Sequence, residues 1–500
     1  MDTLQNVLLG FGVALQPVNL LVCFVGVLVG TAVGVLPGLG PVAAISLLLP
    51  ITFQMSPVSA IIMLAGIYYG AMYGGSTTSI LVNIPGEAAS IVTCLDGYQM
   101  ARQGRAGPAL GIAAFGSFIA GTAGIIGLML MAPLLGRAAV RIGPPEYVAL
   151  MVLALTLVTY LSHGPPLKAL IMAVAGLLIG TIGVDPISGV LRFTFGSVTL
   201  MDGIGIVPVA MGMFGVAEIF DNLGKDIRRE IYETKIRGLF PTLRDWAESL
   251  GAIIRGAIVG FFAGVLPGPS ATIAAFSSYA IEKRLSRHPE RFGHGAIAGV
   301  AGPESANNAA SAAAFIPLLS LGIPANIVMA LLMGALMIHG IQPGPLFFSE
   351  HPDLFWGVVT SMYIGNLMLL VLNLPLIGMW VSVLRVPYGV LFPLILLFCL
   401  IGVYSLNNNA TEIFIMLVFG LAGYLLRKLA FDGTPFLLAL VLGPIFENNL
   451  RQSLIISKGD FSVFLARPLS LIFIVAAGLV LATSVSSGLR KRWRRLEAEV

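Results

Sequence analysis

The sequence contains few charged residues. Of its 500 residues only 10% are Asp, Glu, Lys or Arg, against roughly 25% in an ordinary soluble domain. Lys and Arg number 28 and Asp and Glu 24, and the net charge of +4 is too small and too scattered to indicate nucleic acid as a partner. Because 57% of the residues are hydrophobic and the mean hydropathy is +0.94, we predict an integral, multi-pass membrane protein.

Motifs for catalysis and metal binding are also lacking. The three cysteines, Cys23, Cys94 and Cys399, lie far apart without metal-ligand spacing, which is typical of core thiols. The G-x-x-x-x-G-K-[ST] nucleotide loop, HExxH and GxSxG do not occur, so neither direct use of ATP nor intramembrane proteolysis is indicated. We therefore expect no enzyme, no cofactor and no metal beyond Na⁺ as a coupling ion.

Glycine and proline, in contrast, are abundant. Fifty-nine glycines and 30 prolines in so apolar a chain indicate helices that pack closely or break within the bilayer. At about 20 apolar residues per span, we predict an all-α polytopic membrane protein with about 11 to 13 transmembrane helices. Shorter apolar pieces follow Pro/Gly breaks and are expected to be re-entrant or half-length helices, at 41–53, 84–95 and 269–281.

Part of this glycine and proline pattern is duplicated. GVLVGTAVGVLPG at 26–38 matches GAIVGFFAGVLPG at 256–268, an offset of 230 with eight identities in 13 positions. A weaker match joins LVNIPGEAASIV at 81–92 with LSLGIPANIV at 319–328. G-x-x-x-G by itself indicates ordinary helix packing. Two helices broken by the same VLPG, one in each half, are typical of transporters built from repeats.

The sparse charges indicate how the two halves are oriented. DGYQMARQGR, after the first Ile-Pro break, is basic, whereas HGIQPGPLFFSEHPD, after the second, has no Lys or Arg. The loops after the two VLPG units show the opposite bias, with PITFQMSP uncharged and EKRLSRHPERFGH basic. Because basic loops face the cytoplasm, we predict two inverted-topology repeats, 1–235 and 236–500, with the N-terminus outside and the C-terminus inside.

Polar residues within these apolar segments are the candidate site. Glu87 is one of three charges in the first 101 residues, and it is either a functional carboxylate at membrane depth or a helix cap. Glu304 lies close to Asn307 and Asn308, whose amides either pair between helices or bind a ligand or ion. Oxygen donors suit Na⁺, and helix N-termini suit an anion.

The full set of candidates comes from the two breaks and the two polar segments, which we expect to approach one another near the midplane of the membrane. Arg255 is the one basic side chain next to these motifs. The candidate substrate- or ion-binding residues are Gly38, Gly40, Ser76, Thr77, Thr78, Asn83, Gly86, Glu87, Gly268, Ser270, Thr272, Glu304, Ser305, Asn307, Asn308, Ser311 and Asn326, and the helix-breaking residues are Pro37, Pro85, Pro267 and Pro324.

Taken together, these segments resemble the large membrane subunit of tripartite tricarboxylate transporters, the TctA-like family. The resemblance is carried by GVLPGLGP from Gly34, YYGAMYGGSTTSILVNIPGEAASIVTCLDGYQMARQGRAGPAL from Tyr68, GVLPGPSATIAAF from Gly264, GPESANNAAS from Gly302, IPLLSLGIPAN from Ile316 and ALMIHGIQPGP from Ala335. It implies secondary active uptake of tricarboxylates or related organic acid anions across a bacterial inner membrane, driven by Na⁺ or H⁺.

The same resemblance implies two protein partners, a small four-helix membrane subunit and a periplasmic solute-binding protein, besides the surrounding membrane lipid. It does not identify the carboxylate, because the binding protein selects the substrate in this family. Two alternatives stay open from the sequence. One is a passive channel or exporter for small organic anions, and the other is an intramembrane enzyme.

Overall fold

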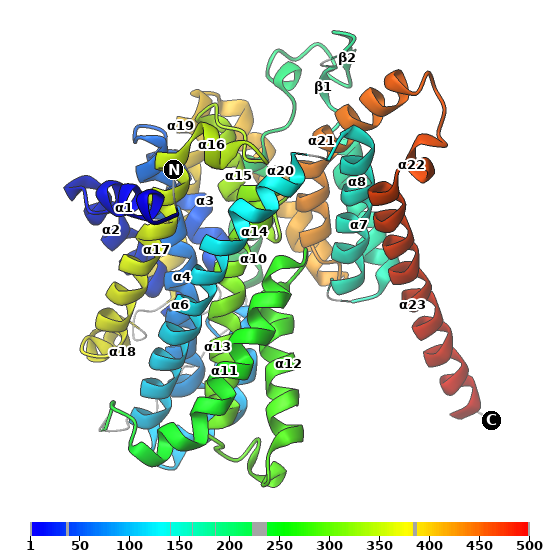
Figure 1. Ribbon diagram of the computed structural model, residues 1–500. Coiled ribbons are helices and arrows are strands. Elements are labelled where there is room, and N and C mark those ends of the chain that lie inside the picture. Colours follow the sequence, from blue (N-terminus) through cyan, green and yellow to red (C-terminus); the bar gives the residue numbers. More distant parts are fainter. Residues whose placement is uncertain are drawn as a thin grey trace. The chain divides into compact units, whose positions relative to one another are not determined.

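The fold was analysed in a computed structural model, which describes residues 3–36, 40–140, 142–162, 164–185, 187–222, 238–383 and 388–498. Its elements are helices apart from one short antiparallel pair of strands, so the predicted all-α polytopic class is confirmed (Figure 1). The chain forms two compact units. The first comprises Met1–Arg137, Val207–Val265 and Ser270–Tyr424, and the second Ala138–Ile206, Leu266–Pro269 and Leu425–Val500.

The first unit contains most of the helices and both polar segments of the candidate site. Its elements are α1 (Thr3–Ala14), α2 (Pro17–Val35), α3 (Gly40–Thr52), α4 (Pro57–Val82), η1 (Ala88–Ser90), α5 (Ile91–Arg102), α6 (Ala106–Ala139), α9 (Ile206–Ala210), the π-helix η3 (Met211–Val216), α10 (Ala217–Asn222), α11 (Leu243–Val265), α12 (Ser270–Leu285), η4 (Pro289–Arg291), α13 (Ala298–Ala313), α14 (Phe315–Leu321), α15 (Ile327–Ile338), α16 (Phe347–Glu350), α17 (Pro352–Asn373), α18 (Ile377–Val383), α19 (Tyr388–Asn407) and α20 (Ala410–Lys428).

The second unit is smaller and contains the only strands among the described residues. Its elements are α7 (Pro144–Leu161), α8 (Pro166–Ile179), β1 (Gly183–Val184), β2 (Leu191–Arg192), η2 (Thr199–Asp202), α21 (Thr434–Ile456), α22 (Val463–Ala466) and α23 (Pro468–Ala498). β1 and β2 pair antiparallel, with Gly183 opposite Arg192.

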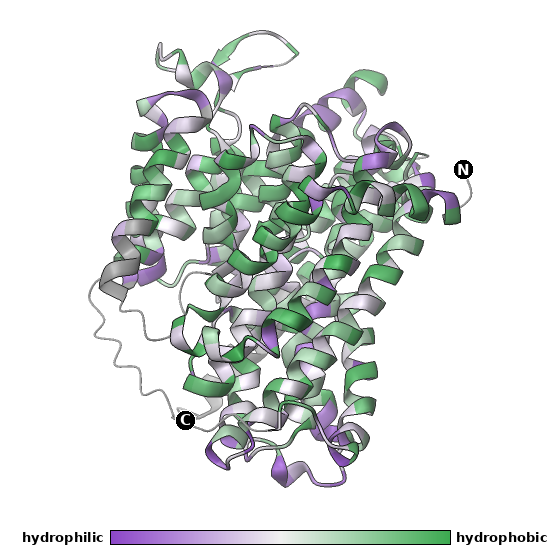
Figure 2. Ribbon diagram, turned by 90° about the vertical axis from the view of Figure 1, so that its left-hand side faces the viewer, coloured by the Kyte–Doolittle hydropathy of each residue, from purple (hydrophilic) through white to green (hydrophobic). Residues whose placement is uncertain are grey.

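Within the described chain, seven helices are long and apolar enough to cross a membrane, namely α2, α4, α6, α7, α11, α17 and α20. Figure 2 shows that apolar residues predominate along most of the helices, whereas many hydrophilic residues lie in the connecting segments. Shorter helices begin where the sequence predicted breaks, including α3 at Gly40 and α12 at Ser270. Helices too short to cross a membrane by themselves are therefore part of the fold, as the glycine and proline content indicated.

The glycines of the first repeated motif bring two helix backbones together. Each of them lies on α2 against a carbonyl group of α4, and a Cβ atom at any of the three positions would overlap that oxygen. The contact pairs advance in the same direction along both helices, so α2 and α4 run parallel. The pairs are Gly26–Met63, Gly30–Ile67 and Gly34–Ala71.

The second copy of the motif makes the same contact in the second half of the chain. Its glycines lie on α11 against carbonyl groups of α13, again without room for a Cβ atom. The pairs are Gly256–Gly302, Gly260–Ala306 and Gly264–Ala310. The duplicated sequence thus corresponds to a duplicated helix pair, in which α2 and α4 match α11 and α13.

Several predicted cytoplasmic loops meet at one end of the first unit. Gln103, after α5, donates a hydrogen bond of 2.8 Å to the carbonyl oxygen of His294, before α13. Arg105 forms an ion pair of 2.7 Å with Asp245, in the first turn of α11. The end of α5 therefore lies beside the start of α11.

The predicted inverted topology and the boundary between 1–235 and 236–500 stay predictions. Each compact unit draws on both halves of the chain, so these units are not the two repeats. The central polar stretch, 221–248, lies partly outside the described residues, because 223–237 are not described.

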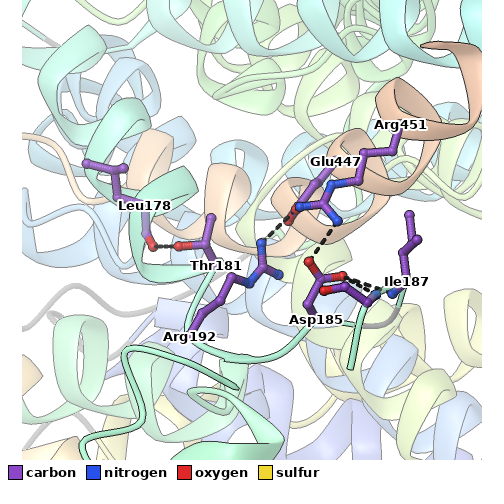
Figure 3. Close-up of polar contacts among 8 residues, drawn as sticks. Leu178, Thr181, Asp185, Ile187, Arg192, Glu447 and Arg451 are labelled. Carbon is purple, nitrogen blue, oxygen red and sulfur yellow. Dashed lines mark hydrogen bonds and ion pairs between the residues drawn. The ribbon is translucent and has the colours of Figure 1, made fainter. Parts of the chain in front are cut away.

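In the second unit, ion pairs hold the β1–β2 hairpin against α21 (Figure 3). Arg451 contacts Asp185 at 2.7 Å and Glu447 at 2.8 Å, and Arg192 contacts Glu447 at 2.7 Å. Asp185 also accepts a hydrogen bond of 2.9 Å from the backbone N–H of Ile187. This backbone hydrogen bond and the guanidinium of Arg451 hold the pKa of Asp185 well below its usual range.

We predict that adding a methyl group to a packed glycine loosens one helix pair. Gly30→Ala or Gly260→Ala should each lower the free energy of unfolding by about 1–3 kcal/mol, because the backbones must separate. Gly334→Ala is the matched control, since no atom lies within 4 Å of its Cβ position. Chemical unfolding in mixed detergent micelles measures the difference, and equal losses in all three variants would contradict this packing account.

We also predict that the β1–β2 hairpin resists acid. A carboxylate whose folded-state pKa is depressed stabilises the fold above its unfolded pKa of about 3.9, and this contribution is lost only as the pH falls through the lower folded value. Hydrogen exchange, corrected for intrinsic rates, should show the hairpin still protected near pH 4. Arg451→Gln should move the loss of protection to higher pH, whereas Lys458→Gln should not. An unchanged profile in Arg451→Gln would rule out the ion pair as the anchor.

Candidate functional site

Two chain breaks of the same design interrupt the two halves of the first unit. Asn83 ends α4 in the left-handed region at φ 58°, and Gly322 ends α14 there at φ 69°. Each break continues through an Ile-Pro step to a residue that caps the next helix. The corresponding positions lie 239 residues apart in the sequence and are Asn83 with Gly322, Pro85 with Pro324, and Glu87 with Asn326.

The two capping side chains satisfy the first N–H groups of the helices that they precede. A carboxylate oxygen of Glu87 accepts a hydrogen bond of 2.6 Å from the backbone N–H of Ala89 at the start of η1. The amide oxygen of Asn326 accepts one of 3.0 Å from Met329 at the start of α15. Glu87 therefore is a helix cap, which was one of its two predicted roles. Its other carboxylate oxygen faces the opposite half of the chain.

Each cap also contacts the helix bundle of the other half. Asn307 on α13 donates a hydrogen bond of 3.2 Å from Nδ2 to Glu87 Oε1. Asn326 donates one of 3.1 Å from Nδ2 to the hydroxyl oxygen of Tyr68 on α4. Because Tyr68 and Asn307 are also 239 residues apart, the two contacts are counterparts. The structure thus brings both breaks to facing helices of the opposite half.

Glu304 lies in the same region with both carboxylate oxygens engaged. It is 1% exposed and accepts hydrogen bonds from the hydroxyl groups of Ser76 on α4 and Thr93 on α5. In the described part of the chain, no Lys, Arg or His side chain pairs with Glu304 or Glu87. A buried carboxylate without a positive partner is costly, so Glu304 stays a candidate functional residue.

Three buried oxygens near these residues have no hydrogen-bond partner among the described residues: Asn307 Oδ1, Ser305 Oγ and Ser270 Oγ. Buried polar atoms without partners are rare and indicate a place for a ligand, an ion or water. The two predicted asparagines therefore differ in their contacts. Asn307 reaches Glu87 and keeps a free oxygen, whereas Asn308 donates to Ser117 Oγ at 2.7 Å and to the Glu304 carbonyl.

Other predicted residues fasten helices. The hydroxyl of Thr78 donates to the carbonyl oxygen of Val35 at 2.8 Å and ties α4 to the end of α2. Ser311 donates to the Asn307 carbonyl of its own helix at 2.9 Å. Gly86 lies against the carbonyl oxygen of Gly34, where a Cβ atom would not fit. These residues stabilise the backbone around the breaks. Their side chains have no unpaired polar atom with which to bind a ligand.

The two VLPG breaks are described less completely. Pro37 and Gly38 lie outside the described residues, and Gly40 begins α3 at φ 57°. Pro267 and Gly268 belong to the second unit, where Gly268 lies next to Leu161.

The start of α12, with Ser270 and Thr272, lies in the first unit beside the first break. Ala275 of this helix packs against Ala89 and Val92. Arg255, the basic residue next to the second motif, forms hydrogen bonds of 2.7 and 2.6 Å with both oxygens of Glu282. Its guanidinium group is therefore already paired.

Sequence reasoning did not place Tyr68 or Thr93 among the candidate residues. The signal for Tyr68 was present, because extending the 239-residue offset backward from the Ile-Pro breaks places Tyr68 opposite Asn307. Thr93 gave no such signal. Its contact with Glu304 depends on α5 running beside α4, so that positions far apart in the sequence face α13 together.

Asp96 is a further residue that the sequence did not single out. It is fully buried on α5, and its Oδ1 accepts backbone N–H groups from the loop before α13, those of Gly293, Gly295 and Ala296, at 2.9, 2.8 and 2.8 Å. Its Oδ2 accepts the hydroxyl of Tyr279 at 2.9 Å. Asp96 thus fastens the helix after the first break to the second half.

We predict that Asp96→Ala lowers the free energy of unfolding by about 3 kcal/mol, because four partly buried donors lose their acceptor. Asp96→Asn should cost less, since an amide oxygen still accepts. Asp353→Ala, at an exposed acid, is the control. Chemical unfolding and protease cleavage of the 286–297 loop report the effect, and an Asp96→Ala protein as stable as the control would disprove this role.

Comparisons with known proteins agree with this architecture. Residues 20–438 match the model of the tripartite tricarboxylate transporter TctA family. The chain is 54% identical over 484 residues, 96% of both chains, to an uncharacterised 52.8 kDa protein in the TAR-I ttuC′ 3′ region of Agrobacterium vitis. It is also 54% identical over 211 residues, 42% of this chain and 87% of the other, to an uncharacterised protein in the TAR-II ttuC′ 3′ region of the same organism. No solved structure matches. The protein therefore belongs to the TctA family and is a multi-pass membrane subunit of a tricarboxylate transporter.

Proposed function

We propose that this protein is the large permease subunit of a binding-protein-dependent secondary transporter that takes up tricarboxylates or related organic acid anions. The pair of counterpart contacts, Glu87 with Asn307 and Asn326 with Tyr68, carries this proposal. Two polar chain breaks that meet inside an apolar bundle are typical of transport sites, because broken helices expose backbone groups to a solute.

Uncharged donors suit the substrate anion at the second break. Asn326 and Tyr68 supply an amide and a hydroxyl, and the N-terminus of α15 adds backbone N–H groups and the positive end of the helix dipole. Arg255 is paired with Glu282. The carboxylate is therefore held by dipoles and a co-bound cation, Na⁺ or H⁺, and not by a fixed positive side chain. With Na⁺ as the cation, Asn307 Oδ1 supplies one of its oxygen ligands.

The proposal includes the two inverted repeats, 1–235 and 236–500. It is supported by the contacts that join the end of α5 to the start of α11, because a repeat that begins where its counterpart ends runs in the opposite direction. It also includes a bacterial inner-membrane location, a small four-helix membrane subunit, and a periplasmic solute-binding protein that delivers the substrate. Family membership supports these partners.

Transport by the reconstituted complex tests this function. Proteoliposomes with both membrane subunits should accumulate labelled citrate only when the binding protein and an inward Na⁺ or H⁺ gradient are both present. Uptake that needs neither would indicate a passive channel, and chemical conversion of the citrate would indicate an enzyme. Either result would refute the proposal.

A variant tests the place of the site. Asn326→Ala removes the cap of α15 and the contact with Tyr68, and we expect the substrate concentration for half-maximal uptake to rise about tenfold, which corresponds to about 1.4 kcal/mol. Asn449→Ala is the control, because Asn449 donates only to the Ile445 carbonyl of its own helix in the second unit, at 2.8 Å. If the two variants respond alike, Asn326 is not part of the substrate site.

A further inference from the structure

We propose that Glu304 is the residue that binds the coupling proton, and that Ser76 together with a small polar cavity forms the route by which this proton is exchanged. The inference rests on the proposed function, because it assigns the coupling step of the same transport site. It goes further by naming H⁺ as the ion and by naming the atoms that carry it.

Among the described residues, no positive side chain balances the carboxylate of Glu304. The titratable groups that face Glu304 are Tyr73 on α4, Glu87 at η1 and Cys94 on α5, and none of them is positive. On the other elements packed against α13, Arg255 of α11 and Glu282 of α12 neutralise each other, and α14 has no titratable residue. α6, which contacts α13 through Ser117, has its one charged residue, Arg137, in its last turn. Asp96 is held by backbone N–H groups and Tyr279. Glu304 is buried and Glu87 is partly buried, and two such carboxylates without a cation are costly, so the region favours uptake of one positive charge.

The hydrogen bonds around Glu304 fit both the charged and the neutral form of its carboxyl group. Ser76 Oγ donates to Glu304 Oε2, and it also lies 3.3 Å from the carbonyl oxygen of Met72. When the carboxylate takes up a proton, the new O–H donates to Ser76 Oγ, and the serine hydroxyl turns to Met72. Thr93 donates to Oε1 in both states. Neither oxygen of the Glu304 carboxyl group nor the Ser76 hydroxyl is left without a partner in either state, so protonation requires only the rotation of one hydroxyl.

A small cavity beside Ser76 offers a route for the proton. Ser76 lines a cavity of about 10 Å³, close to the volume that holds one water molecule. Tyr73, Thr77, Ser117 and Asn373 add polar groups to its wall. Asn373 is 5% exposed, and its Oδ1 has no partner among the described side chains. A buried oxygen without a partner, in a cavity of this size, indicates a place for water. In release, Ser76 Oγ accepts the proton of Glu304 while the serine hydroxyl proton passes to water in this cavity, and in uptake the two transfers run in reverse, so the backbone does not have to move.

The chemistry of the step balances without a further reactant. The carboxylate of Glu304 and one proton form the neutral acid, and loss of that proton regenerates the carboxylate. Neutral Glu304 repels an anionic substrate less than charged Glu304 does. Proton binding and anion binding therefore favour each other by the same factor, which is the requirement for symport.

Glu304→Gln tests the proposal, because glutamine keeps the shape of the neutral acid but binds no proton. In Na⁺-free proteoliposomes with the binding protein, uptake of labelled citrate driven by a pH gradient should fall at least about tenfold. Exchange of internal for external citrate, which needs no net proton movement, should fall much less than gradient-driven uptake. Gradient-driven uptake that survives in the variant, or wild-type uptake that follows Na⁺ at constant pH, would overturn the proposal.

A measurement without substrate separates this inference from the proposed function. Infrared difference spectra of the purified protein after a pH jump should show a deuterium-sensitive carboxylic C=O band. We expect the band to be absent in Glu304→Gln and retained in Glu87→Gln. The band can be present in a protein that does not transport citrate. That result would support the proton site and refute citrate as the substrate. A band that persists in Glu304→Gln refutes the proton site.

The route has its own test with a matched pair of serines. Ser76→Ala should slow uptake driven by the pH gradient about tenfold. Ser320 is as deeply buried, on α14, but its hydroxyl donates only to the Ile316 carbonyl of its own helix. Ser320→Ala should therefore behave as wild type. Equal gradient-driven rates in the two variants would exclude Ser76 from the route.

Discussion

The close approach of two pairs of helix backbones is the constraint on which the rest of the first unit depends. Where α2 crosses α4, and where α11 crosses α13, glycines place backbone against backbone with no room for a side chain. The same approach leaves a slot at the end of α2, in which Gly86 lies between Gly34 and Gly75. A chain break at membrane depth is tolerable only where neighbouring protein covers it, and these crossings provide the cover.

The two breaks share a backbone design but differ in chemistry. At the same repeat position the first half has Glu87 and the second has Asn326, and each contacts the opposite half through counterpart residues. Glu304 has Ala65 as its counterpart, 239 residues earlier, so the carboxylates gather on one side of the arrangement. In the proposed mechanism this asymmetry separates proton binding from carboxylate binding. The acidic side binds the coupling proton, and the amide side, with the N-terminus of α15, binds the carboxylate.

The sequence predicted features that depend on local pattern. Apolar composition indicated a polytopic helical protein, and the VLPG and Ile-Pro steps located broken helices, because proline and glycine act on the backbone where they stand. It did not predict that 138–206 and 425–500 join in a separate unit, since that partition depends on long-range packing. Glu304 and Asn307 were chosen for their polarity in an apolar segment. Their partners Ser76, Thr93 and Glu87 could be assigned only from the arrangement of α4, α5 and η1 around α13.

The central claim is that the two halves run in opposite directions, so that their breaks meet from opposite sides. Gln103 and Gln342 are exposed, lie 239 residues apart and follow the corresponding helices α5 and α15. Single Gln103→Cys and Gln342→Cys variants, in a chain without Cys23, Cys94 and Cys399, can be labelled with a membrane-impermeant maleimide in right-side-out and inside-out vesicles. The account predicts that Gln103→Cys reacts only from the cytoplasmic side and Gln342→Cys only from the outside. Labelling of both from the same side would contradict it.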